Sequence, residues 1–123
     1  MYKKTVLATH YKYFMSTNTK IIQPSGILNS ISGNQLRRYI NDCVAAGAKI
    51  VLVDLQEVDF IDSSGLGALV AAMQTVKSSD GQMFICSLNE QVKMLFELTK
   101  MERIFKVFAN QEKFKNHFLA IEK

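Results

Sequence analysis

Two adjacent serines, Ser63 and Ser64, offer the most specific chemical opportunity in this chain of 123 residues. They follow Lys49–Leu55, an apolar run that predicts a buried strand, and they precede apolar residues at helical spacing. We therefore expect them where a strand gives way to a helix. The first turn of a helix has free backbone N–H groups and the positive end of the helix dipole. A hydroxyl at this point could cap the helix, and a phosphate there would be held by the same donors.

The other reactive residues match no known catalytic or metal-binding pattern. His10 and His117 have no partner at metal-ligand spacing, and the two serines do not lie in a Gly-x-Ser-x-Gly turn. Asp54, Asp59 and Asp62 could be imagined as a metal cluster, but their spacing is more typical of a solvated loop at the end of a strand. The sequence therefore predicts no catalytic residue, no metal site and no cofactor.

Composition excludes several further classes of protein. Apolar residues make up 48% of the chain and charged residues 21%, which is typical of a globular domain. Much of the formal net charge of +4 comes from the two ends of the chain, with acidic residues interleaved in the C-terminal half, whereas nucleic-acid binders more often carry a dense basic stripe. No apolar run approaches the roughly 20 residues that span a bilayer, and the N-terminus lacks the apolar core of a signal peptide. We expect a cytoplasmic protein that binds neither nucleic acid nor membrane.

The two cysteines, Cys43 and Cys86, are far apart and form no Cys-x-x-Cys pair. Each falls in an apolar segment, which predicts that both are small buried hydrophobic residues.

Strands and helices alternate along the chain. Apolar residues at helical spacing predict a helix after Ser30 or Ser32, either of which could cap it, with these residues on its buried face: Leu36, Tyr39, Ile40, Cys43 and Val44. Lys49–Leu55 lacks alternation, which is typical of a central parallel strand that is buried on both faces. A second helix is expected over about Ser64–Lys77. One side of it is unusually small (Gly67, Ala68, Ala71 and Ala72), which fits either tight packing or a docking face.

The second half of the chain continues the alternation. We expect a strand at Gln82–Ser87, a short helix capped by Asn89, a strand at Ile104–Phe108 and a terminal helix capped by Asn110. The fold class is therefore α/β, with a mostly parallel sheet and helices packed against it. Residues 1–19 are predicted to be an N-terminal extension or a hairpin strand, with Met15 as an alternative start.

The segment Val58–Gly67, with Asp62 followed by two serines, resembles the signature of bacterial anti-sigma factor antagonists. These proteins belong to the STAS group of domains, which they share with sulfate transporters. The similarity continues through Gly81–Cys86 and Val92–Leu98. It implies a single STAS-type domain over residues 20–123. The family commonly has Gly-x-Leu-Asp near its start, whereas this chain has Asn29 in place of the aspartate.

The resemblance also implies a function and a set of partners. The first serine after the aspartate accepts phosphate in this family and corresponds to Ser63, which leaves Ser64 a minor or capping role. It implies a regulatory protein, not an enzyme, that binds a serine kinase acting as an anti-sigma factor and is released on phosphorylation. A PP2C-type phosphatase would reverse the switch. The alternative is a small-ligand-binding or transport-accessory module. We expect a monomer or a weak homodimer.

The docking surface is predicted to surround Ser63. The predicted partner-binding residues are Gly26, Asn29, Asp62, Ser63, Ser64, Gly65, Gly67, Ala68 and Ala71.

Overall fold

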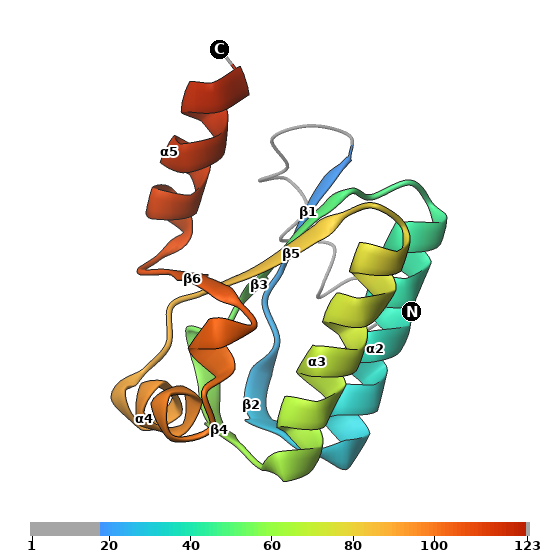
Figure 1. Ribbon diagram of the computed structural model, residues 1–123. Coiled ribbons are helices and arrows are strands. Elements are labelled where there is room, and N and C mark those ends of the chain that lie inside the picture. Colours follow the sequence, from blue (N-terminus) through green and yellow to red (C-terminus); the bar gives the residue numbers. More distant parts are fainter. Residues whose placement is uncertain (1–17, 123) are drawn as a thin grey trace.

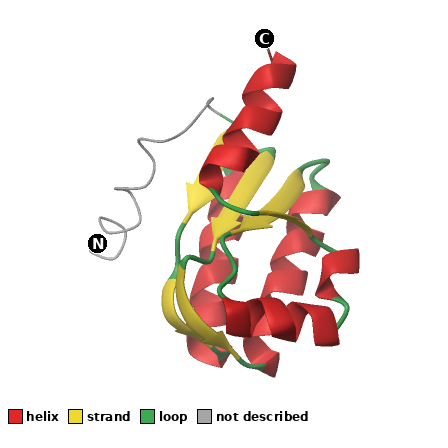
Figure 2. Cartoon of the chain, turned by 90° about the vertical axis from the view of Figure 1, so that its left-hand side faces the viewer, coloured by secondary structure: helices red, strands yellow, loops and turns green. Residues whose placement is uncertain are grey.

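Two parallel sheets form the framework of the computed structural model, which describes residues 18–122 and the side chains as far as Phe118. The larger sheet has the strand order β1-β3-β5-β6, and the smaller one pairs β2 with β4. In chain order the elements are β1 (Thr19–Ile22), β2 (Ser25–Leu28), α2 (Ser30–Ala45), β3 (Ile50–Asp54), β4 (Glu57–Ile61), α3 (Ser63–Ser78), β5 (Gln82–Cys86), α4 (Glu90–Leu98), the 3₁₀ helix η2 (Met101–Arg103), β6 (Lys106–Phe108) and α5 (Gln111–Glu122). Figure 2 shows the smaller sheet set apart from the larger one.

The central strand β3 is buried on both faces, as its continuous apolar sequence predicts. Val51 and Val53 belong to the main core, together with residues of α2 and α3. Leu52 points to the opposite face and joins a second cluster with Phe84 and Phe114. The prediction of a mostly parallel α/β fold is therefore confirmed.

Helices α2 and α3 run side by side over one face of the large sheet (Figure 1). Leu36, Ile40 and Cys43 of α2 are buried, which confirms the predicted apolar face. The predicted caps of α2, Ser30 and Ser32, are wrong: the N-cap is Asn29, because its side chain accepts hydrogen bonds from two backbone N–H groups of the first turn.

Helix α5 covers the opposite face of the large sheet. Its Phe114 is fully buried, with its ring centroid 5.8 Å from that of Phe84 and 5.5 Å from that of Phe108. Asn110 accepts a 2.9 Å hydrogen bond from the Lys113 N–H, which confirms the predicted cap. The predicted last strand begins later than expected, at Lys106, because the N–H of Phe105 closes a turn onto the Met101 carbonyl.

The smaller sheet was not predicted. The chain passes Pro24 after β1 and pairs again from Ser25, this time with β4. Strand β4 lies within the segment that we expected to be a loop between a buried strand and the helix. The extension or hairpin strand predicted for residues 1–19 lies, apart from Asn18 and Thr19, outside the described range. Within that range, no helix is long and apolar enough to cross a bilayer.

Candidate functional site

Ser63 is the first residue of α3 and is exposed to solvent. The residue that caps the helix is Asp62, whose carboxylate accepts a 2.9 Å hydrogen bond from the Gly65 N–H. The predicted capping role of Ser64 is therefore wrong, because Asp62 precedes both serines and already fills that position. Among the described residues, neither serine hydroxyl has a hydrogen-bond partner. Both hydroxyls are therefore available to another molecule.

The start of α2 lies next to this site and is capped differently. Asn29 Oδ1 accepts hydrogen bonds from the N–H groups of Ile31 and Ser32, at 3.0 and 3.1 Å. The Ser32 hydroxyl accepts from the Asn29 N–H at 2.9 Å and donates to the Ile27 carbonyl at 2.7 Å. This reciprocal capping box joins β2 to α2 and fixes the loop between them.

Direct backbone contacts hold the two helix starts together. The Asp62 N–H donates to the Leu28 carbonyl at 3.1 Å. Gly65 is buried against the same carbonyl: a Cβ at this position would overlap the Leu28 oxygen and lie 2.8 Å from its carbon. One turn further along, a Cβ on Gly33 would lie 2.8 Å from that of Ala68. Only small residues fit these contacts. The start of α3, with Ser63 and Ser64 (the serine loop), therefore has a fixed position relative to Asn29.

The nine predicted partner-binding residues differ in exposure. Ser63, Ser64 and Gly67 are exposed, Gly26, Asn29, Asp62 and Ala71 are half-buried, and Gly65 and Ala68 are buried. Gly65 and Ala68 pack inside the molecule, so their expected contribution is to position the others. The small side of α3 is thus divided, with Ala68 and Ala72 in the core and Gly67 facing solvent.

Three exposed apolar residues near the serine were missed by the sequence analysis. Ile31 follows Asn29 on α2 and is 70% exposed, and Ile27 on β2 is 53% exposed. Phe60 on β4, three residues before Ser63, is 49% exposed. Large exposed apolar side chains that gather on one face of a protein are typical of interaction sites. Their positions could be recognised only after β2 and β4 had been assigned.

Asp54 lies apart from this exposed site. It was expected in a solvated loop with Asp59 and Asp62, and this expectation is wrong, because its side chain is only 1% exposed. It accepts hydrogen bonds from Gln23 Nε2 at 3.2 Å, Gln111 Nε2 at 2.6 Å and the Gln56 N–H at 2.9 Å. Over the described part of the chain, no three His, Cys, Asp or Glu side chains are placed to hold a metal ion.

Cys86 ends the neighbouring strand and is fully buried, and Cys43 is buried as well, as predicted. Burial raises the pKa of the Cys86 thiol from an ordinary value of 9.0 to about 12. The thiolate is the nucleophilic form, so Cys86 has little reactivity near neutral pH.

Comparison with known proteins identifies a family. A family model described as "STAS domain" matches residues 15–114. A protein of Bordetella bronchiseptica with the provisional name anti-sigma factor antagonist BtrV is 29% identical over 87 residues, which is 71% of this chain and 75% of that protein. A crystal structure from Thermotoga maritima, also provisionally named as an anti-sigma factor antagonist, has 25% identity and a TM-score of 0.76 and covers 88% of this chain and 96% of its own.

A more distant likeness is to SpoIIAA of Bacillus, an anti-sigma factor antagonist with two solved forms. The unphosphorylated form has 18% identity and a TM-score of 0.69 over 83% of this chain and 90% of its own. The phosphorylated form has 16% identity and a TM-score of 0.64 over 84% of this chain and 94% of its own. At these identities the likeness concerns the fold alone.

Proposed function

The chain belongs to the STAS domain family, and from that premise we propose that it is a regulator of the anti-sigma factor antagonist type, switched by phosphorylation of Ser63. Unphosphorylated, it binds a serine kinase that acts as an anti-sigma factor, and phosphorylation releases it. A PP2C-type phosphatase restores the binding form. The observation that carries the proposal is the exposed hydroxyl of Ser63, which lies just after the Asp62 cap and has no hydrogen bond within the described residues.

Phosphorylation of Ser63 would change charge far more than shape. A phosphate adds about −1.5 to −2 charges near neutral pH. It would lie next to Asp62, and Asp59 of the preceding strand adds a further exposed acidic residue to this segment. The Gly65 N–H is already used by Asp62, so this donor is not free to neutralise the phosphate. Because Ser63 is exposed, the added charge would lie at the surface, toward any partner docked there.

Phosphorylation of Ser63 should leave the fold of the domain intact. The free hydroxyl has no intramolecular hydrogen bond to lose among the described residues. Negative charge in the first turn of a helix also interacts favourably with the helix dipole. A docked partner gains no such compensation, so its affinity should fall while the fold is retained. SpoIIAA, which shares this fold, has been solved with and without phosphate, and this supports a switch of the same kind.

The proposed docking surface consists of the exposed and half-buried residues around Ser63. Ser64 and Gly67 extend it along α3, and Asn29 and Gly26 extend it to the neighbouring loop. Gly65 and Ala68 support this surface from beneath. Because the small residues leave few side chains in the way, a kinase could place its active site close to the Ser63 hydroxyl.

Site mapping tests this function. Candidate kinases are serine kinases encoded beside this chain in its genome. After treatment of the wild-type protein with a purified candidate, mass spectrometry should place the phosphate on Ser63, and Ser63→Ala should abolish incorporation. The Ser64→Ala variant is the matched control and should be phosphorylated like the wild type. Phosphate found mainly on Ser64, or in another segment, would refute the assignment. No phosphorylation by any candidate kinase would favour the transport-accessory alternative.

A further inference from the structure

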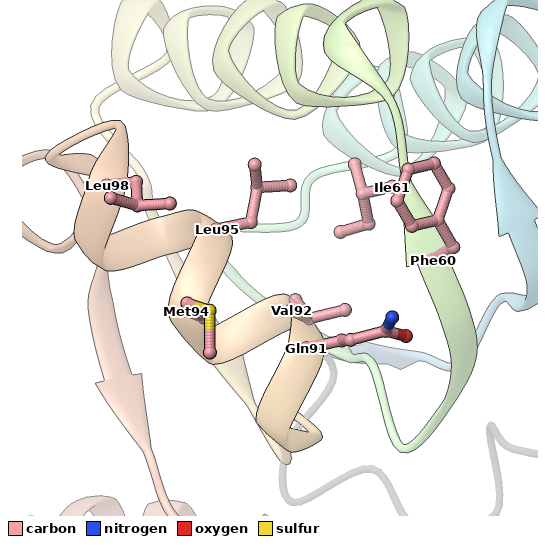
Figure 3. Close-up of a pocket in the computed structure, with 7 residues that line it drawn as sticks. All are labelled: Phe60, Ile61, Gln91, Val92, Met94, Leu95 and Leu98. Carbon is pink, nitrogen blue, oxygen red and sulfur yellow. The ribbon is translucent and has the colours of Figure 1, made fainter.

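A shallow apolar groove lies between α4 and β4, next to the serine loop. We call it the α4–β4 groove, and its main residues are Phe60, Val92, Met94, Leu95 and Leu98. Figure 3 shows Val92 and Gln91 extending from α4 toward β4, where Phe60 and Ile61 lie. Its floor is buried, since Ile61 and Val92 are each 1% exposed. Its rim faces solvent, with Met94 59% and Leu98 74% exposed.

The groove is held open by hydrogen bonds that do not involve its apolar side chains. Asn89 caps α4, accepting a 2.7 Å bond from the Val92 N–H. Its amide also donates to the carbonyls of Val58 and Asp59 on β4, at 3.0 and 3.4 Å. These hydrogen bonds attach the start of α4 to β4. The groove is therefore already ordered before another molecule binds in it. Preformed sites lose less affinity to ordering than flexible ones.

The groove is continuous with the Ser63 surface. Phe60 forms part of its rim, and β4 leads from Phe60 through Ile61 and Asp62 directly to Ser63. Ile27 of β2 pairs with Phe60 in the smaller sheet and is exposed as well. Exposed apolar side chains therefore lie a few residues from Ser63, and a partner that covers the serine will reach them.

The residues beside Ser63 are too small to bind a partner tightly. Specific protein interfaces bury about 800 Å² on each partner, and a few large side chains provide most of the affinity. Ser63, Ser64, Gly67 and Ala71 offer little apolar area. Large exposed side chains nearby are Ile27, Ile31 and Phe60, and Met94 and Leu98 line the same groove as Phe60.

We infer that the α4–β4 groove is the second contact of the kinase that docks on Ser63, and that it receives apolar side chains of that kinase. The inference rests on the proposed function. In this arrangement the groove supplies affinity that does not depend on charge, and Ser63 supplies the charge that abolishes binding. Charge repulsion is screened by salt, whereas apolar burial is not. The two contributions can therefore be separated experimentally.

The double variant Met94→Gln/Leu98→Gln tests the groove. Both side chains are exposed, so the fold should be retained, and thermal unfolding checks this. The matched control, Lys93→Gln/Glu97→Gln, alters two exposed residues of the same helix that do not line the groove and leaves the net charge unchanged. The probe is the purified kinase that phosphorylates Ser63, with affinity measured by calorimetry at low and high salt.

We expect the groove variant to bind about tenfold more weakly at both salt concentrations, and the control to bind like the wild type. Equal affinity of the groove variant and the wild type, for a kinase that does phosphorylate Ser63, would overturn the inference and leave the proposed function intact. Reduced self-association on sedimentation, with unchanged kinase affinity, would assign the groove to a second copy of this chain and would also overturn it. If no kinase phosphorylates Ser63, the proposed function fails, and the inference fails with it.

Discussion

The two parallel sheets of this protein have very different carboxyl ends. The larger sheet ends at Asp54 and Cys86, which are both buried, and Gln111 at the start of α5 covers Asp54 with a hydrogen bond. The smaller sheet ends at Leu28 and Ile61, and the chain passes at once into α2 and α3, with Ser63 exposed. Binding groups in parallel α/β sheets usually follow the carboxyl ends of strands. We therefore place the candidate site by exposure and free hydrogen-bonding groups, and not by strand ends alone.

We call the exposed carboxyl end of the smaller sheet the open end, and the buried carboxyl end of the larger sheet the closed end. The largest expected effect concerns the contact between Gly65 and Leu28, which positions the open end. Gly65→Val should lower the free energy of unfolding by about 3 kcal/mol, because its Cβ would overlap the Leu28 carbonyl, and buried overpacking is strongly destabilising. Urea unfolding measures this. Gly67→Val is the matched control: nothing lies within 4 Å of its Cβ, and the change should stay below about 0.5 kcal/mol. Equal effects of the two substitutions would contradict the close packing at Gly65.

Asp54→Ala tests the closed end and should cost about 2 kcal/mol of unfolding free energy, because it leaves Gln23 and Gln111 without their acceptor. Asp59→Ala, on the exposed side of β4, is the matched control and should change stability by less than about 0.5 kcal/mol. Chemical denaturation of both variants compares the two carboxylates directly. A loss of similar size at Asp59 would mean that the two ends are not as different as the structure indicates.

The Asn29 cap of α2, at the exposed end of the smaller sheet, should respond to a change of charge. Asn29→Ala should cost about 1 kcal/mol, since two N–H groups lose their acceptor. Asn29→Asp keeps the acceptor and adds a negative charge at the helix start, so it should stabilise the protein by about 0.5 kcal/mol at low salt. Thermal unfolding at two salt concentrations checks both values. The gain should shrink as salt screens the charge, and a gain independent of salt would require another cause.

The smallest effect at neutral pH concerns Cys86 at the closed end. Its pKa is raised from 9.0 to about 12 by burial, so the folded protein keeps a proton that the unfolded chain loses as pH rises above about 9. The contribution of this thiol to stability is therefore present below pH 9 and is lost as pH rises toward 12. At pH 8, alkylation of Cys86 should be much slower in the native protein than in urea, as peptide mass spectrometry can show. Equal rates would mean that the closed end opens readily.

Sequence patterns predicted the core of this fold better than its edges. The apolar run at β3 and the helical spacing of Leu36, Ile40 and Cys43 reflect burial directly, so these elements were found. Strands β2 and β4 are short, and only Leu28, Val58 and Ile61 in them are fully buried, so they produce a weak alternation. Asp54 shows a further limit: its partners Gln23 and Gln111 are distant in sequence, and only the fold brings them together.

The candidate site was predicted only in part, because some of its features depend on residues that are distant in sequence. Local order along the chain placed Ser63 at the start of a helix, since a strand-like run, two serines and a helical pattern follow one another. The choice between Asp62, Ser63 and Ser64 as the cap depends on one or two residues of register, which propensity does not determine. The exposed Ile27 and Phe60 are neighbours only because β2 pairs with β4. A local pattern contains no information about such pairing.

The central claim, that charge at Ser63 controls binding, is tested most directly by titrating the kinase with four forms of the protein. These are the wild type, quantitatively Ser63-phosphorylated protein, Ser63→Asp and Ser63→Ala. We predict that Ser63→Ala binds like the wild type, that phosphorylated protein binds at least about tenfold more weakly, and that Ser63→Asp lies between them because it has less charge than phosphate. Circular dichroism should show the same fold in all four. Equal affinity of the wild type, the phosphorylated protein and Ser63→Asp would contradict the account.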